Sequence, residues 1–290
     1  MKKYLVLAII AILFAACSKE INNEVNNNEL VPVHVHVSGF SVSQEEFSGT
    51  RTAQDVADYA GVSSITLAFY ASNGTEVYKT TQAKGDTGFG TFNLSLPMGS
   101  YTMVAVAYYN SDASPLELTS PTAAAFTGSR AYETFAATQA VNVNNTEAVD
   151  ISATLSRIVS KLQVVSTDGK TADVTNVRMT FSAGGKSFNP TSGLATVNTG
   201  FVNTVGNSAA VGNTSTSLSF LFLATDEQDI DVTIETLDAD GNTLFSKTIE
   251  DVPFKRNRVT KLTGAMYTND ALAGAFQVNT AWLTEENVAF

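Results

Sequence analysis

Cysteine and histidine, which often act as nucleophiles, general bases or zinc ligands, are rare in this chain. The 290 residues include one cysteine, Cys17, and two histidines, His34 and His36. The histidines are two positions apart in an alternating segment, so on a β-strand they would share a face and could bind zinc together with a third ligand. The chain has no further histidine, and Cys17 lies far away. We therefore favour an outward-facing polar surface, opposite an inward face of valines (Val31, Val33, Val35 and Val37).

The carboxylates form no pattern that is typical of a catalytic or metal site. Asp238, Asp240 and Asn242 resemble part of a calcium-binding loop, but Gly241 comes too early and no glutamate stands at the far end. A hairpin turn is the better interpretation of this segment. The sequence has no GxSxG, Walker or HExxH motif. We expect no catalytic residue, no metal site and no cofactor, and we predict that the protein is not an enzyme.

Basic side chains gather in one short segment within an acidic chain. The formal net charge is −11, a balance that repels phosphate backbones and argues against nucleic-acid partners. For the basic segment we therefore expect local ion pairs rather than a polyanion site. Its members are Lys255, Arg256, Arg258 and Lys261.

The surroundings of Cys17 indicate export and lipidation. Two lysines near the start precede an apolar run, Tyr4–Phe14, and two alanines stand directly before Cys17. This is the layout of a secretory signal, and the run is shorter than the roughly 20 residues that span a bilayer. A small residue before cysteine also resembles a lipobox, where bacterial lipoproteins are cut and acylated, although Phe14 departs from its usual aliphatic residue. We predict a lipoprotein signal peptide over residues 1–16 and lipidation of Cys17; a plain secretory signal with a chance cysteine is the alternative.

A lipidated cysteine implies a protein that is anchored to a membrane. Each buried methylene of a lipid contributes about 0.8 kcal/mol, so two or three acyl chains would anchor the chain firmly. Acylation would also leave no thiol for a disulfide. The segment after the cysteine is polar and rich in Asn and Glu, and it cannot form a core. We expect residues 17–30 to be the lipidated cysteine and a flexible tether.

Short β-strands are the elements that must position the remaining residues. Apolar and polar residues alternate over many short runs rich in Val, Ile, Thr, Tyr and Phe, which favours strands. Asn73-Gly74 and Asp240-Gly241 are typical hairpin tips. Many short strands separated by turns predict an all-β fold of β-sandwiches. Examples of the alternating runs are Val33–Val37, Ile65–Tyr70 and Phe92–Tyr109.

Two segments depart from this pattern of alternating strands. Thr52–Gly61 could form one short helix that ends at Gly61. Residues 114–136 contain two prolines and are expected to be a loop with a helical turn.

The length of the chain suggests two domains, and we place an N-terminal β-sandwich at 31–155 and a C-terminal β-sandwich at 156–290.

Several segments, taken in order, are similar to one known family. After the lipobox come a first strand, VHVHVSGFSVS, then SGTRT around Arg51, then LSLPMGSYTMVAVAY, which resembles a "leucine-proline-x-glycine-x-tyrosine" strand turn. VPFKRNRVTKLTGAMYT follows in the second half, and AFQVNTAW with Trp282 lies near the end. In this order the segments resemble the fimbrillin superfamily of Bacteroides-type bacteria, the lipoprotein precursors and anchors of type V pili. The resemblance covers nearly the whole chain.

The resemblance implies two transthyretin-like β-sandwich domains in tandem and a mechanism of assembly. In shaft subunits an arginine-specific protease cuts behind the first strand, and Arg51 lies where that cut would fall. Loss of the strand opens a groove that a C-terminal strand of a neighbouring subunit fills. Here Val31–Val37 would be displaced and Phe276–Phe290 would be the donor. In an anchor-type member the lipid is kept, Arg51 is an ordinary loop residue, and Val31–Val37 stays in its sheet.

The expected function is that of a lipid-anchored fimbrial subunit or fimbrial anchor with a structural and adhesive role. Its expected partners are other fimbrial subunits, the outer membrane through the lipid, and a host or bacterial surface receptor. The alternative is a glycan-binding surface lipoprotein of a nutrient-uptake system. Such a module needs aromatic platforms, for which the candidates are Tyr108, Tyr109, Tyr132 and Trp282.

Overall fold

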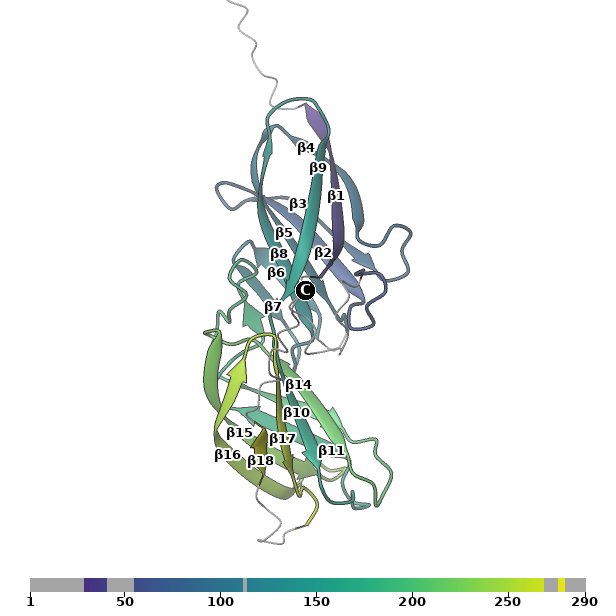
Figure 1. Cartoon of the computed structure of the whole chain (residues 1–290), viewed down its shortest axis with the longest axis vertical. Helices are drawn as coiled ribbons and strands as arrows, with labels where there is room; N and C mark the ends of the chain where they lie inside the picture. The colour runs from purple at the N-terminus through teal and green to yellow at the C-terminus, as the bar shows by residue number, and fades with distance from the viewer. Residues whose placement is uncertain (1–28, 41–54, 112–113, 269–275, 280–290) are drawn as a thin grey trace, which may run out of the picture.

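The protein is built from β-strands, as the computed structural model shows (Figure 1). The structure describes residues 29–40, 55–111, 114–268 and 276–279. These residues form eighteen strands and no helix, which confirms the predicted all-β, sandwich-type fold. Within them no helix is long and apolar enough to cross a membrane.

Seven strands form the first group, in the order β3-β2-β5-β8-β9-β1-β4. β8 and β9 pair only at Phe135 with Arg157 and at Ala136 with Ser156. The sheet therefore folds at this point into two halves that face each other across a core. The strands are β1 (Leu30–Phe40), β2 (Ser64–Ala71), β3 (Glu76–Ala83), β4 (Thr91–Pro97), β5 (Gly99–Tyr108), β8 (Thr134–Val143) and β9 (Val149–Arg157).

Alternation along each strand decides which side chains enter this core. In β1, Val33 and Val35 are fully buried, whereas His34 and His36, which alternate with them, are exposed. Burying one valine side chain stabilises the fold by roughly 1.5–3 kcal/mol, so the inward face of a single strand contributes several kcal/mol. Core residues from the strands around β1 include Phe92, Leu94 and Leu96 of β4 and Ile151, Ala153 and Leu155 of β9.

Eight strands form the second group, as two four-stranded sheets in the orders β14-β10-β17-β18 and β13-β11-β15-β16. Their core includes Leu162, Val177 and Phe254, all at most 2% exposed. The strands are β10 (Ser160–Ser166), β11 (Asn176–Phe181), β13 (Phe201–Gly206), β14 (Thr216–Leu221), β15 (Glu227–Leu237), β16 (Thr243–Lys255), β17 (Val259–Gly264) and β18 (Gln277–Asn279).

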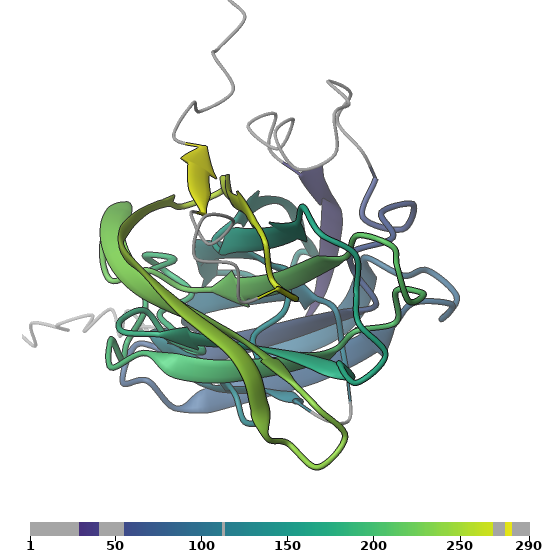
Figure 2. The ribbon, with the colours of Figure 1, turned by 90° about the horizontal axis from the view of Figure 1, so that it is seen from below.

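The long β15–β16 pair curves strongly across one end of the second group, as the view along the long axis shows (Figure 2). Its register shifts between Ile230 and Val232 and again between Thr236 and Leu237. Such irregularities increase the local bend and twist of a strand pair. They allow one pair to wrap around the core instead of continuing as a flat edge.

A small sheet lies between the two groups (Figure 1). It contains β6 (Leu116–Ser120), β7 (Ala123–Phe126) and β12 (Ser187–Phe188), in the order β12-β7-β6. Phe126 and Phe188 both stack on Phe222, with ring centroids 6.3 and 4.3 Å apart. These rings belong to a third buried cluster that also includes Tyr70 and Val104 of the first group. The junction between the groups is therefore packed like a core.

Both hairpin tips predicted from the sequence are confirmed. Gly74 has φ +83° and its N–H donates to the Ala71 carbonyl at 2.8 Å. Gly241 has φ +85°, and its N–H donates to the Asp238 carbonyl at 3.3 Å. These left-handed conformations favour glycine because it has no Cβ. The Asp238–Asn242 segment is thus a hairpin turn.

The helix predicted over 52–61 is wrong for the residues that the structure describes there, 55–61. They form turns. The Asp55 carboxylate accepts a hydrogen bond from the Ala57 N–H at 2.9 Å, a local bond that competes with helix formation. Burial of Val56 and a hydrogen bond from the Tyr59 hydroxyl to Glu133 also hold the segment against the sandwich. Residues 52–54 lie outside the described residues.

The loop with a helical turn predicted over 114–136 is also wrong, because this segment contains the β6–β7 hairpin. Pro115 precedes β6 and Pro121 stands in the turn between the strands. Neither proline therefore removes a donor from within a strand. Leu118 and Phe126 of the hairpin are buried at the junction, so tertiary packing decides its conformation.

A bidentate ion pair across β11 and β15 makes the stability of the second group depend on pH. Arg178 donates to Glu235 through Nε and Nη2 at 2.6 and 2.7 Å. The hydrogen bonds from Arg178 hold the pKa of the Glu235 carboxyl below its usual range; burial opposes this shift in part, and the Thr243 hydroxyl adds to it. Because the pKa is lower in the folded than in the unfolded state, the pair stabilises the fold above the unfolded pKa of about 4.3. That contribution is lost as the pH falls through the folded pKa.

We expect Glu235→Gln to destabilise the protein near neutral pH and to have a smaller effect at acid pH, where protonation of the wild-type carboxyl removes the same charge. Urea denaturation at both pH values measures the difference. Glu76→Gln is the control, because Glu76 pairs with Lys79 at the exposed surface, where an ion pair contributes about 0–1 kcal/mol. If Glu235→Gln lowers the free energy of unfolding by the same amount at both pH values, this account is contradicted.

Candidate functional site

β1 is the first described strand, yet it lies inside its sheet. It pairs antiparallel with β4, from Leu30 with Pro97 to His36 with Thr91. On its other side it pairs parallel with β9. Removing β1 would therefore uncover two strand edges and the core beneath them. Its inward valines, Val31, Val33, Val35 and Val37, are at most 1% exposed.

The two histidines lie on the outer face of β1, as predicted. His34 Nδ1 is 2.6 Å from Asn93 Oδ1, and His36 Nδ1 is 3.2 Å from Thr91 Oγ1. Both partners belong to β4, so these contacts join neighbouring strands. Among the described residues no group of three or more His, Cys, Asp or Glu side chains could hold a metal ion.

The other residues singled out from the sequence fall into different places. Cys17 and Arg51 lie outside the described residues, as does Trp282. Tyr108 and Tyr132 are buried, while Tyr109 is 47% exposed and its ring centroid is 5.4 Å from that of Tyr132. The ion pairs expected for the basic segment are present: Lys255 pairs with Glu227 at 2.5 Å and Arg256 with Asp226 at 2.7 Å.

A buried ionic cluster at the junction was not predicted. The Arg157 side chain is fully buried, and its Nη2 lies 2.7 Å from Glu133 Oε1. Arg157 also donates to Asn257 Oδ1 at 3.1 Å and to the Tyr59 hydroxyl at 3.0 Å. Its guanidinium lies 4.7 Å from the centroid of the Phe135 ring. One side chain thus joins β9 to the β16–β17 turn and to the segment before β2.

The surroundings of this cluster shift the titration of two groups. Burial and the negative charge of Glu133 raise the pKa of the Tyr59 hydroxyl, so it stays protonated and donates to Glu133 at 2.7 Å. Burial lowers the pKa of Lys161; the charge of Glu133 opposes that shift and the charge of Arg157 adds to it. A sequence signal for the cluster existed, because Arg157 continues the inward face of Ile151, Ala153 and Leu155.

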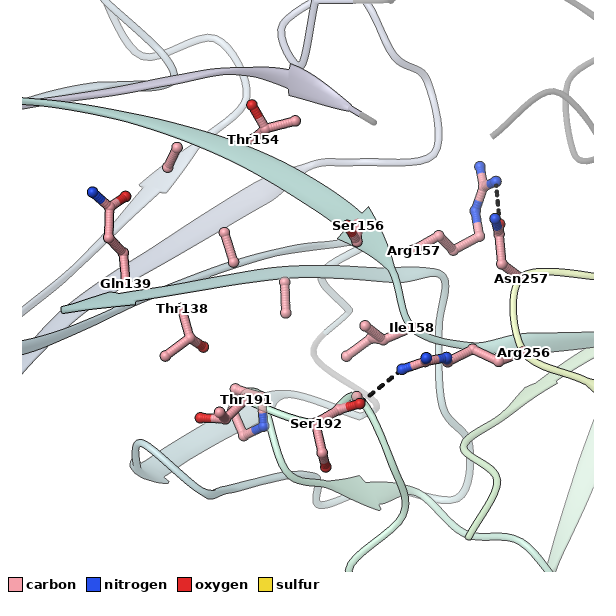
Figure 3. A pocket seen from close by; sticks show the side chains of 15 residues that line it. Thr138, Gln139, Thr154, Ser156, Arg157, Ile158, Thr191, Ser192, Arg256 and Asn257 are labelled. Carbon is pink, nitrogen blue, oxygen red and sulfur yellow. Dashed lines mark hydrogen bonds between the residues drawn. The ribbon is translucent and has the colours of Figure 1, made fainter. Parts of the chain in front are cut away.

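A polar pocket of about 680 Å³ lies beside this cluster (Figure 3). Its walls come from β8, β9, the 190–193 loop and the turn at Arg256 and Asn257. In Figure 3 the ribbons of β8 and β9 are close near Ser156 and separate toward Gln139 and Thr154. The pocket therefore occupies the space where the two strands stop pairing. Its size is within the usual range for ligand pockets, about 300–1,000 Å³.

Local hydrogen bonds fix the 190–193 loop at the wall of the pocket. The Gly193 N–H donates to the Asn189 carbonyl at 2.7 Å, and Arg256 Nη1 donates to the Ser192 carbonyl at 2.7 Å. Gly193 has φ +72°, and a Cβ there would lie 2.8 Å from both Arg256 Nη1 and Ile158 Cγ2. Only glycine permits this close approach, so the shape of the pocket depends on it.

Solved structures with this fold come from Bacteroides and Porphyromonas. A candidate adhesin from Bacteroides ovatus is 12% identical, with a TM-score of 0.53 over 87% of this chain and 94% of that chain. The fimbrial anchor protein Mfa2 from Porphyromonas gingivalis is 12% identical, with a TM-score of 0.51 over 86% of this chain and 95% of that chain. A candidate polysaccharide-binding protein from Bacteroides thetaiotaomicron is 13% identical, with a TM-score of 0.50 over 86% and 96%.

These likenesses confirm, at the level of the fold, the resemblance to fimbrillins seen in the sequence. No curated protein sequence matches this chain. Residues 31–287 match the model of a family of unknown function, DUF6562, and the chain belongs to that family.

Proposed function

We propose that this protein is a lipid-anchored subunit or anchor of a surface fimbria, with a structural and adhesive role and no catalytic activity. Two observations support the proposal: the fold is shared with a fimbrial anchor protein and with a candidate adhesin, and Cys17 stands in a lipobox-like sequence. The lipid on Cys17 holds the chain at the outer membrane. Residues 17–30 separate it from an N-terminal domain at 31–155 and a C-terminal domain at 156–290.

The proposed mechanism of assembly follows from the position of β1 inside its sheet. A first strand paired on both sides can leave only if another strand replaces it, because two open edges and an apolar face would otherwise meet water. Cleavage after Arg51 would separate β1 from the rest of the chain. A strand from a neighbouring subunit then fills the groove, with backbone hydrogen bonds for affinity and alternate apolar side chains for specificity.

The proposed donor is the segment Phe276–Phe290. Its described part contains β18, Gln277–Asn279, which pairs with β17. Among the described strands β18 lies at the edge of its sheet, so its release breaks backbone pairing on one side only. In the anchor form of the proposal Arg51 is not cut, β1 stays in place and the lipid remains.

A glycan-binding surface lipoprotein is the second candidate function. The likeness to a candidate polysaccharide-binding protein and the exposed ring of Tyr109 favour it. The burial of Tyr108 and Tyr132 argues against this function, because an aromatic platform for sugars needs an exposed ring face. Binding on a glycan array that is lost in Tyr109→Ala would favour this function over the fimbrial one.

The intact mass and N-terminus of the protein from native outer membranes test the fimbrial proposal. We expect a chain that starts at an acylated Cys17 for an anchor, or a chain without lipid that starts at Thr52 for a polymerising subunit. The second result predicts ladders of oligomers on unboiled gels. A chain without lipid that starts at any other residue would contradict the role given to Cys17.

A further inference from the structure

The pairing of β8 with β9 stops abruptly at the pocket. The Ile158 N–H donates to the Thr134 carbonyl at 3.1 Å, and the last paired residues are Ala136 and Ser156. Hydrogen-bonded pairs alternate along an antiparallel ladder, so Thr138 and Thr154 would form the next bonded pair. Both line the pocket instead. Their backbone N–H and C=O groups therefore point into the space between the strands.

The walls of the pocket confirm that it meets the strands at their edges. Successive side chains of a strand point to opposite faces, but four successive residues of β8, from Ala136 to Gln139, line the pocket. The buried Thr138 Oγ1 has no hydrogen-bond partner. An open strand edge with an unsatisfied hydroxyl suits an extended polypeptide, whose backbone supplies donors and acceptors at the spacing of the ladder.

β18 runs toward the end of β17 that lies nearer this pocket. In the antiparallel pairing with β17, Thr263 lies opposite Gln277 and Lys261 lies opposite Asn279. A continuation in the same direction would pass Val259 and reach Asn257, which lines the pocket. Residues 280–290 span about 36 Å when extended, at about 3.3 Å per residue, a length sufficient to pass the turn and enter the space between β8 and β9.

The charge of residues 280–290 also favours their binding at this pocket. The segment 280–290 contains Glu285 and Glu286 and no basic residue. A path from β18 to the pocket would run along the basic segment defined above, Lys255, Arg256, Arg258 and Lys261, in which Lys255 pairs with Glu227 and Arg256 with Asp226. Opposite charges on the segment and on its path favour their association.

We propose that residues 280–290 of the same molecule run from β18 along the β16–β17 turn and occupy the pocket as an extended strand at the edges of β8 and β9. This inference goes beyond the proposed function, because it concerns a single molecule and requires neither the lipid nor assembly. If the same segment is also the donor in assembly, its release from the pocket precedes strand exchange.

Amide hydrogen exchange at Thr138 and Thr154 tests the proposal, because a paired edge exchanges slowly and an open edge exchanges fast. We compare the chain with a version that ends at Asn279. We expect exchange at both amides to become at least about tenfold faster in the shortened chain, and a synthetic peptide of residues 280–290 to restore the protection. Unchanged exchange at amides of β2 and β11 shows that the shortened chain is folded.

A second variant keeps the test informative if the shortened chain does not fold. Full-length protein with Glu285→Lys and Glu286→Lys should also lose protection at Thr138 and Thr154. The control with Glu117→Lys and Glu250→Lys makes the same charge change at exposed positions elsewhere and should not. Unchanged exchange in the Glu285 and Glu286 variant would overturn the proposal. So would protection that appears only at high protein concentration, because a second copy would then be the occupant. Neither result bears on the N-terminus that tests the fimbrial function.

Discussion

Removing β1 is expected to unfold the first sandwich, and a peptide of residues 30–40 is expected to refold it. The reason is the burial of four valines on one strand, each 1% exposed or less, at roughly 1.5–3 kcal/mol per side chain. Their sum is comparable to the total stability of a typical domain, about 5–15 kcal/mol. The strand also closes two edges, those of β4 and β9. Amide exchange and circular dichroism of a chain that starts at Thr52, with and without the peptide, measure the effect.

The control peptides distinguish specific binding in the groove left by β1 from non-specific binding to apolar surface. A peptide with Val33→Asp and Val35→Asp should not restore the fold, because it would place two carboxylates in the core. A peptide with His34→Ala and His36→Ala should restore it, since both histidines face solvent. A peptide of residues 276–290 that also restores the fold would support strand exchange. If the chain that starts at Thr52 stays fully folded alone, the groove is not a binding site for a strand.

Arg157→Met is expected to cost about 3–5 kcal/mol of stability, the usual result of removing one partner of a buried ion pair. The substitution leaves the Glu133 carboxylate buried without the guanidinium that neutralises it. It also removes the hydrogen bond to Asn257, so the contact of β9 with the β16–β17 turn is lost. Urea denaturation gives the change in free energy of unfolding.

Arg178→Met is the matched control, because this arginine also pairs with a glutamate but is 30% exposed. We expect a loss of about 1 kcal/mol there. Adding Glu133→Gln to Arg157→Met should recover part of the loss, since it removes the unpaired charge. A penalty for Arg157→Met no larger than that for Arg178→Met would show that the cluster does not stabilise the fold.

Most of the strands could be predicted because their signals are local. The alternation of valine and histidine in β1 makes one face apolar whatever it packs against, and Asn73-Gly74 forms its turn through a conformation that glycine adopts readily. The β4–β5 hairpin follows from the same kind of pattern, with Pro97 and Gly99 at its tip. Such features depend on residues a few positions apart, and a single sequence displays them.

The two segments that were predicted incorrectly are decided by distant contacts. Residues 55–61 have a helical composition, but Tyr59 is held by Glu133 and Arg157, which lie 74 and 98 positions away. The β6–β7 hairpin is stabilised by packing against Phe188 and Phe222 of the second half. Local propensity is weak, at most about 1 kcal/mol for an ordinary residue, and such contacts override it.

By itself the sequence determined the strand content, the hairpin tips, the inward face of β1 and the lipobox-like setting of Cys17, because each depends on neighbouring residues. Only the tertiary structure decided that β1 lies between β4 and β9, that Arg157 is buried against Glu133, and that β8 and β9 separate to leave a pocket. These features join residues as far apart in the sequence as Val33 and Val149. Pairing over such distances is set by the shared burial of apolar faces and by the need to satisfy buried charges, which no local pattern encodes.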